Sequence, residues 1–171
     1  MNRRTKILLA VAGFLVLVPA ALWIVGSLMP RDHVAHVEVR LAASRADVWA
    51  RIADPVGSAR WRASVSGVER LPDREGLPCF REHTSNGAIT YVHETRVDGS
   101  RLVTRIVDNT DFGGRWEYAI TADGAGTLLV ITEYGEVYNP IFRVLGRYVF
   151  GYDTTLRTYA SDLTDELEPG T

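Results

Sequence analysis

The sequence predicts an α+β fold: a seven-stranded, curved antiparallel sheet wrapped on a long C-terminal helix, with two short helices after the first strand and one transmembrane helix before the domain. Three patterns favour this fold. Residues 7–29 form an uncharged apolar run, residues 67–137 resemble strands separated by turn signals, and residues 141–167 carry apolar side chains every three or four positions. These patterns are typical of a membrane span, an antiparallel meander and an amphipathic helix, respectively.

The N-terminal run is long enough to cross a bilayer. From Ile7 to Met29 there are 29 − 7 + 1 = 23 residues without a charged side chain. At about 1.5 Å per residue, such a helix spans a hydrocarbon core of about 30 Å with some tilt. We therefore expect residues 1–30 to be a transmembrane anchor and residues 31–171 to be a separate domain.

Two other interpretations of the run remain open. Residues 18–20 (Val-Pro-Ala) form a weak small-residue cleavage site after a short apolar core, as in a signal peptide. The run continues well past this site, which favours an uncleaved anchor, and a buried helix of a soluble protein is the least favoured. Arg3, Arg4 and Lys6 precede the run, so the positive-inside rule predicts a cytoplasmic N-terminus. The chain is then a single-pass protein of the cell membrane whose domain lies outside the cytoplasm.

Composition excludes several kinds of site. Without the three basic residues before the apolar run, 19 − 3 = 16 basic residues face 21 acidic ones, a net charge of −5, which argues against a nucleic-acid surface. The single cysteine, Cys79, excludes an internal disulfide and a cysteine-rich metal site. The remaining length suits one domain with a substantial core.

The domain begins with a strand and two short helices. Residues 33–41 alternate apolar and polar side chains, which predicts a half-buried strand. Residues 44–47 resemble a capping box, and Val48, Trp49 and Ile52 form an apolar helical edge behind it. The Asp54-Pro55 pair ends this helix or begins a second one.

Six further strands follow, linked mostly as hairpins. The pairs Asn86-Gly87, Asp98-Gly99 and Asp123-Gly124 favour hairpin turns, because these residue types tolerate positive φ. With the first strand, the sheet has seven strands, the other six near residues 67–71, 78–84, 88–97, 101–108, 114–122 and 127–137.

A long helix closes the chain. Asn139 is a good N-cap and Pro140 suits the first helical position. A helix from here to residue 167 has up to 29 residues, and its apolar stripe consists of Ile141, Leu145, Tyr148, Tyr152, Leu156, Tyr159, Leu163 and Leu167. Since a straight helix cannot fill the concave face of a strongly curved sheet, we expect an internal cavity between them.

Two glycines weaken this helix. Gly146 and Gly151 lie on either side of the apolar stripe, and Phe150 points nearly opposite to it. Each glycine costs about 1 kcal/mol relative to alanine. One hypothesis is that residues 146–151 form a bend that opens to admit a ligand, with Phe150 at the entrance or against the membrane. The alternative is that the glycines only permit close packing.

Together these segments resemble the START-like helix-grip superfamily, also called SRPBCC or polyketide cyclase/dehydrase-like. The resemblance covers about residues 33–167, and the segments that carry it are SRADVWARIADP with the following Arg60-Trp61, GRWEYAIT, GTLLVITEYGEV and NPIFRVLGRYVFGYDTTLRTYASDL. Members of this superfamily are cups for hydrophobic ligands. Most bind or carry lipids, sterols, polyketides or quinones, and a minority are cyclases or other enzymes. The resemblance therefore implies that residues 31–171 are a hydrophobic-ligand-binding domain.

Strand alternation and the helical stripe nominate side chains for the pocket. Ile89, Tyr91, His93 and Val97 are the favoured inward set of one strand, whereas both faces of residues 127–137 remain plausible. His93 could act as a general base or hold a ligand carbonyl, although a structural hydrogen bond is the commoner role of such a histidine. The predicted ligand-binding residues are Tyr91, His93, Trp116, Tyr118, Tyr134, Phe142, Tyr148 and Tyr152. No catalytic residue is assigned.

No metal or cofactor is expected. His33 and His36 are three positions apart on a strand, so their side chains point to opposite faces and cannot chelate one ion. The sequence lacks a GxSxG elbow, a phosphate loop and a dinucleotide fingerprint. Glu82 and Glu94 fit a surface ladder of charges.

The leading functional prediction is a membrane-anchored binding or carrier domain for a lipid or another hydrophobic small molecule, held between the sheet and the C-terminal helix, with membrane contact through residues 7–29. A first alternative is a cyclase or dehydratase acting on a polyketide-like or other apolar substrate, with His93 or a tyrosine transferring a proton. A second alternative is a structural or protein-interaction module with a filled core and no ligand.

Overall fold

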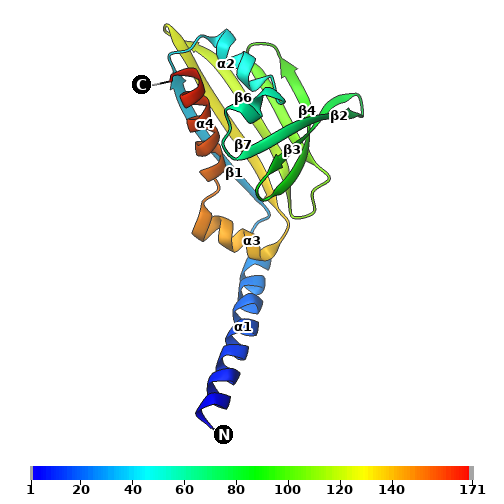
Figure 1. Cartoon of the computed structure of the whole chain (residues 1–171), viewed down its shortest axis with the longest axis vertical. Coiled ribbons are helices and arrows are strands. Elements are labelled where there is room, and N and C mark those ends of the chain that lie inside the picture. Colours follow the sequence, from blue (N-terminus) through cyan, green and yellow to red (C-terminus); the bar gives the residue numbers. More distant parts are fainter. Residues whose placement is uncertain (1, 170–171) are drawn as a thin grey trace.

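The computed structural model describes residues 2–169 and has the predicted order of elements. A long helix, α1 (Arg3–Ser27), projects from an α+β domain (Figure 1). The domain contains β1 (Asp32–Leu41), α2 (Arg45–Ile52), a 3₁₀ turn η1 (Gly57–Arg60), β2 (Val65–Arg74), β3 (Leu77–Thr84), β4 (Gly87–Val97), β5 (Arg101–Val107), β6 (Phe112–Asp123), β7 (Gly126–Val137), α3 (Pro140–Leu145), a π-helical turn η2 (Gly146–Phe150) and α4 (Thr154–Leu167).

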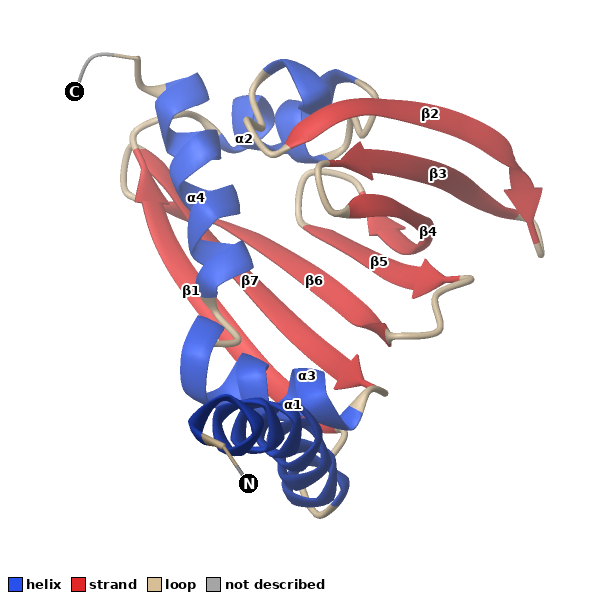
Figure 2. Cartoon of the chain, turned by 60° about the horizontal axis from the view of Figure 1, so that its bottom comes forward, coloured by secondary structure: helices blue, strands red, loops and turns tan. Residues whose placement is uncertain are grey.

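The strands of the described chain form one antiparallel, seven-stranded sheet in the order β1-β7-β6-β5-β4-β3-β2. From β2 to β7 each strand pairs with its neighbour in sequence, and β1 closes the order by pairing with β7. The sheet is strongly curved, so that β2, β3 and β4 turn away from the helix that covers β1 and β7 (Figure 2). The predicted meander and its seven strands are confirmed.

The first two short helices also form where the sequence predicts them. The Ser44 hydroxyl accepts a hydrogen bond from the backbone N–H of Asp47 at 3.3 Å, which caps α2. Val48 and Ile52 are the buried edge of that helix. The second helix is η1, and the carboxylate of Asp54 accepts from the N–H of Gly57 at 3.0 Å at its start.

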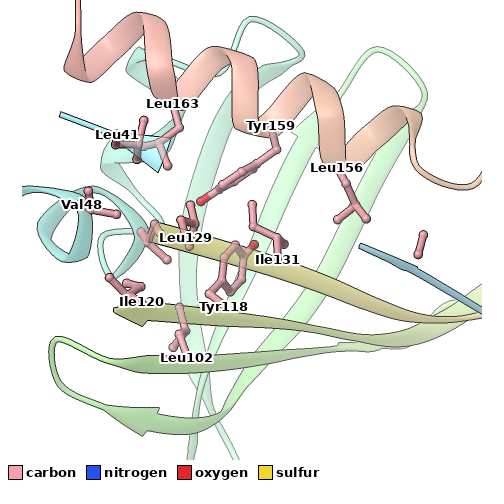
Figure 3. Packing of buried hydrophobic residues seen from close by; sticks show 12 residues of the cluster. Leu41, Val48, Leu102, Tyr118, Ile120, Leu129, Ile131, Leu156, Tyr159 and Leu163 are labelled. Atoms are coloured by element: carbon pink, nitrogen blue, oxygen red, sulfur yellow. The ribbon is translucent and has the colours of Figure 1, made fainter. Parts of the chain in front are cut away.

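The core lies between α4 and the concave face of the sheet. Leu156 and Leu163 of α4 are fully buried against Leu129 and Ile131 of β7 and their neighbours (Figure 3). The other labelled members of this cluster are Leu41, Val48, Leu102, Tyr118, Ile120 and Tyr159. Burying these apolar side chains is the main force that holds the helix on the sheet.

The C-terminal helix is not continuous, and the prediction of one helix of up to 29 residues is wrong. The Asn139 side chain caps α3 by accepting from the N–H of Ile141 at 3.0 Å, as expected. The chain then widens into η2, where the N–H of Gly151 donates to the carbonyl of Gly146 at 3.0 Å, and Gly151 ends the helix with φ of +77°. Since side chains other than glycine rarely adopt this conformation, Gly151 permits the break. The break interrupts the stripe, and Tyr148 is exposed.

The structure contains both features that were expected of Gly146 and Gly151, a bend and close packing. A bend is present at residues 146–151. A Cβ atom on Gly146 would lie 2.9 Å from the ring of Tyr152, so this glycine also permits close packing. Opening of the bend to admit a ligand stays a prediction.

Among residues 2–169, α1 is the helix that is long and apolar enough to cross a bilayer. None of its most apolar stretch is buried by the rest of the chain. At its C-terminal end, α1 packs against α3 (Figure 2).

We predict that η2 exchanges its amide hydrogens faster than α4. None of the η2 side chains is buried, whereas α4 buries four residues, so η2 can open without disrupting the core. Hydrogen exchange of the full chain in detergent micelles, resolved by peptide, measures both segments. Equal protection of residues 146–150 and 156–163 would contradict the prediction and would count against a gate at this turn.

Candidate ligand-binding site

A cavity of about 640 Å³ lies between the concave face of the sheet, α4 and the segment formed by α3 and η2. This volume is in the range of about 300–1,000 Å³ that is typical of small-molecule sites. The sheet side of the wall includes Tyr91 and His93 from β4, Thr104 and Ile106 from β5, and Trp116 and Tyr118 from β6.

Strand register explains why these side chains share one face. Tyr91 is opposite Ile106, and His93 is opposite Thr104, which is in turn opposite Trp116. Residues directly opposite each other in an antiparallel pair point to the same side of the sheet. The inward direction of Trp116 and Tyr118 follows from the alternation of β6.

Aromatic rings form the part of the wall next to α4. The ring of Tyr159 lies 5.2 Å from Trp61, 5.5 Å from Tyr118 and 5.9 Å from Trp116, measured between centroids. Burial raises the pKa of the Tyr118 and Tyr159 hydroxyls above the ordinary value. Both phenols, like ordinary tyrosines, are neutral at physiological pH and can donate a hydrogen bond.

A charge pair is set into the same wall. Arg62 donates through Nη1 to Oε2 of Glu82 at 2.5 Å and through Nη2 to Oε1 at 3.0 Å. Both side chains are nearly buried, and the guanidinium lies 5.1 Å from the ring centroid of Tyr159. Burial opposes the charge on Arg62, but the hydrogen bonds and the negative charge of Glu82 outweigh it and raise the pKa of Arg62.

His93 is buried between Phe80 and Tyr91, with centroid distances of 4.8 and 6.1 Å. Burial, followed by the positive charges of Arg96 and Arg70, lowers the pKa of His93 to about 4. The imidazole is thus neutral at physiological pH. A neutral imidazole can accept a proton or a hydrogen bond from a group in the cavity.

A second histidine lies at the end of the cavity nearest α3. The His33 ring stacks on Tyr152 at 3.9 Å, and its Nε2 is 3.6 Å from Oε1 of Glu133. Gly135 makes room for this ring, since a Cβ atom there would lie 2.2 Å from it. Within the described residues no group of three or more His, Cys, Asp or Glu side chains could hold a metal ion.

Of the eight residues predicted from the sequence, the structure brings six to the cavity wall: Tyr91, His93, Trp116, Tyr118, Phe142 and Tyr152. Tyr134 lies instead on the outer face of β7, 38% exposed, with the Arg115 guanidinium 4.7 Å from its ring centroid. The alternation of β7 turns its neighbour Glu133 into the cavity. Ligand contact by the six residues stays a prediction.

Two more side chains do not lie where the sequence predicts. Tyr148 is exposed beside Arg147 because the π-helical turn moves it off the buried stripe. Val97 is exposed because a bulge between His93 and Thr95 shifts the alternation of β4 by one position.

The ion pair between Arg62 and Glu82 is not predicted by the sequence patterns. Glu82 was expected on the surface, yet it is two positions from the inward Phe80 and opposite Ile89, which lines the cavity. The spacing of two residues between Phe80 and Glu82 on one strand is the signal that predicts an inward Glu82 side chain. No comparable signal exists for Arg62, which lies in the irregular segment between η1 and β2.

We predict that His93 stays unprotonated until the pH approaches 4. Its pKa is depressed in the folded chain, so the unfolded chain binds the proton first, and His93 lowers the stability of the fold as the pH falls from about 6.5 towards 4. Histidine ring signals in an NMR titration of the full chain, assigned with His93→Gln, measure this directly. A His93 midpoint near 6.5 would contradict the burial that the structure shows.

Comparisons with known proteins agree with the fold. Among solved structures, a START superfamily protein from Mycobacterium smegmatis has a TM-score of 0.66 and 20% identity, and the match covers 81% of this chain and 99% of that one. A truncated norcoclaurine synthase from Thalictrum flavum has a TM-score of 0.64 and 10% identity, with coverage of 82% of this chain and 96% of that one. The di-domain ARO/CYC protein BexL from the BE-7585A biosynthetic pathway has a TM-score of 0.66 and 15% identity, with coverage of 86% and 53%, so this chain spans about half of it.

No functionally curated protein matches the sequence. A family model does match, over residues 32–161, which include all seven strands and the first half of α4. Its description is "Polyketide cyclase / dehydrase and lipid transport". The match covers most of the chain, and the fold has the helix-grip architecture. This chain therefore belongs to the polyketide cyclase/dehydrase and lipid transport family of the START-like superfamily.

Proposed function

We propose that this protein is a membrane-anchored binding or carrier domain that holds a lipid or another hydrophobic small molecule between its sheet and its C-terminal helix. The observation that carries the proposal is the cavity of about 640 Å³, which α4 and the curved sheet leave between them. Such a volume suits a ligand with an extended apolar body. It weighs against the interpretation as a structural module with a filled core.

The wall indicates what the ligand looks like. Aromatic and aliphatic side chains such as Trp116, Ile106 and Leu102 suit an apolar body. Neutral donors and acceptors on Tyr118, Tyr159 and His93 suit a hydroxyl or carbonyl group. The positive charge of Arg62 is already paired with Glu82, so the wall favours a neutral polar group over a free anion.

The second part of the proposal is that the apolar N-terminal helix anchors the domain in the membrane. Residues 7–29 would cross the cell membrane once, with a cytoplasmic N-terminus, and residues 31–171 would lie outside the cytoplasm. Tethering the domain beside the bilayer raises its effective concentration where hydrophobic ligands reside.

Filling the cavity should displace the ligand. We predict that Thr104→Trp combined with Ile106→Trp lowers the amount of co-purifying apolar molecule about tenfold, because both side chains line the cavity. The matched control is Arg105→Trp with Val107→Trp, one position along the same strand and on the opposite face of the sheet. Mass spectrometry of organic extracts of the full chains, purified in the same detergent, measures the content.

Lipid that merely surrounds α1 is the same in all three chains and cancels in this comparison. A molecule that is depleted in the cavity-filled chain alone supports the proposal. Equal extracts from all three, with each chain folded by circular dichroism, would overturn it.

A second candidate, a cyclase or dehydratase, is favoured by one observation: the neutral imidazole of His93 in the cavity wall beside Tyr91. A base in this position could take a proton from the carbon next to a substrate carbonyl and return it to the hydroxyl group that leaves the neighbouring carbon, so that one water is released and a carbon–carbon double bond forms. If this candidate is right, the molecule extracted from His93→Gln contains one water more than the molecule extracted from the unmodified chain. Identical molecules in both extracts favour the carrier.

A further inference from the structure

We propose that α3 and η2 lie in the interfacial layer of the same bilayer that α1 crosses, so that the cavity opens directly onto lipid. The partner of this surface is the bilayer itself. The inference rests on the anchoring part of the proposed function and not on the identity of any ligand.

The domain is joined to α1 by a very short connection. α1 ends at Ser27 and β1 begins at Asp32, so residues 28–31 alone separate the two. In Figure 1, α3 lies between the end of α1 and the sheet. A connection of this length leaves the domain little room to tumble away from the membrane surface.

Direct packing of α1 on α3 restricts the orientation further. Gly26 is the buried residue of α1. A Cβ atom on Gly26 would lie 1.9 Å from the carbonyl oxygen of Pro140, so only glycine allows the two helices to approach this closely.

Arg143 also connects α1 to α3. Its side chain is buried and donates to the carbonyls of Gly26 at 3.0 Å and Met29 at 3.4 Å, at the C-terminal end of α1. It also donates to the carbonyls of Val137 at 2.7 Å and Tyr138 at 2.8 Å, where β7 ends. A cation at a helix C-terminus is favourable for the helix dipole, and here it joins the span, α3 and the sheet.

Exposed apolar side chains gather beside this junction. After residue 28, the exposed large hydrophobic residues of the described chain are Val34, Val56, Val97, Tyr134, Phe142, Tyr148, Val149 and Phe150. Half of them fall within residues 142–150, and in η2 Tyr148, Val149 and Phe150 are 70%, 65% and 64% exposed. Contiguous exposed apolar surface marks a binding face, and aromatic residues are enriched at the membrane interface.

The same segment borders the cavity. Phe142, Gly146, Phe150 and Gly151 are part of the cavity wall. The surface that faces the bilayer is therefore also the rim of the cavity. A hydrophobic molecule can then pass between lipid and cavity without crossing water.

Depth measurement tests the proposal without any added ligand. A nitroxide on Phe150→Cys is compared with one on Val56→Cys, in full chains reconstituted into phosphatidylcholine nanodiscs. Val56 is exposed and follows α2, which lies at the end of the domain opposite α1 (Figure 1). The native Cys79 is buried and is replaced by alanine in both chains. The relative accessibility to oxygen and to a water-soluble nickel complex reports the depth of each label.

We expect the Phe150 label about 5–10 Å below the level of the headgroups and the Val56 label in water. Equal exposure of both labels to the nickel complex would overturn the proposal. So would strong spin–spin broadening at Phe150 that persists in detergent, since it would show that a second copy of the chain covers this surface. The readout contains no ligand, so failure of the carrier proposal and failure of this one are distinguishable.

A matched pair of glycine substitutions tests the junction. Gly26→Ala places a methyl group against the Pro140 carbonyl, whereas Gly13→Ala, in the middle of α1, meets no atom within 4 Å. We expect Gly26→Ala to move the Phe150 label towards water by several ångströms, up to the whole depth of about 5–10 Å, and Gly13→Ala to leave it in place. Unchanged depth in Gly26→Ala would show that the junction does not hold η2 at the membrane.

Discussion

The structure depends on how a straight helix packs on a curved sheet. α4 must bury Leu156 and Leu163, and β1, β7 and β6 supply the surface that accepts them. The sheet bends away beyond β5, so one helix cannot cover β2, β3 and β4 as well (Figure 2). Core and cavity are thus two consequences of one geometry. Where sheet and helix are in contact the protein is closely packed, and where they diverge a cavity remains.

The Arg62–Glu82 pair places two nearly buried charges in the cavity wall. Removing two charges from water is costly, and a well-packed pair of apolar side chains of similar volume is often at least as stable. The pair lies against Tyr159, close to the aromatic wall. A pair of apolar side chains would leave this part of the wall without charged hydrogen-bonding groups.

The sequence predicted the elements better than the directions of individual side chains. Period-two alternation and the three Asx-Gly turns placed the seven strands within a few residues, since both signals are local. The bulge in β4 depends on its partner strand and reversed the direction predicted for Val97. In β7 both faces carry apolar residues, so the sequence pattern could not decide between Tyr134 and Glu133. Arg62 was missed because it belongs to an irregular segment with no period.

The break in the C-terminal helix links the two halves of the molecule. α3 is held by Arg143 and by its contact with α1, whereas α4 is held by the sheet through its buried leucines. Residues 146–153 join these two fixed elements, bury little, and include a glycine with positive φ. A movement of α1 and α3 relative to the sheet would have to be absorbed by this segment, by residues 28–31 and by residues 138–139, which join β7 to α3. Because residues of this segment also line the cavity, such a movement would change the shape of the cavity wall.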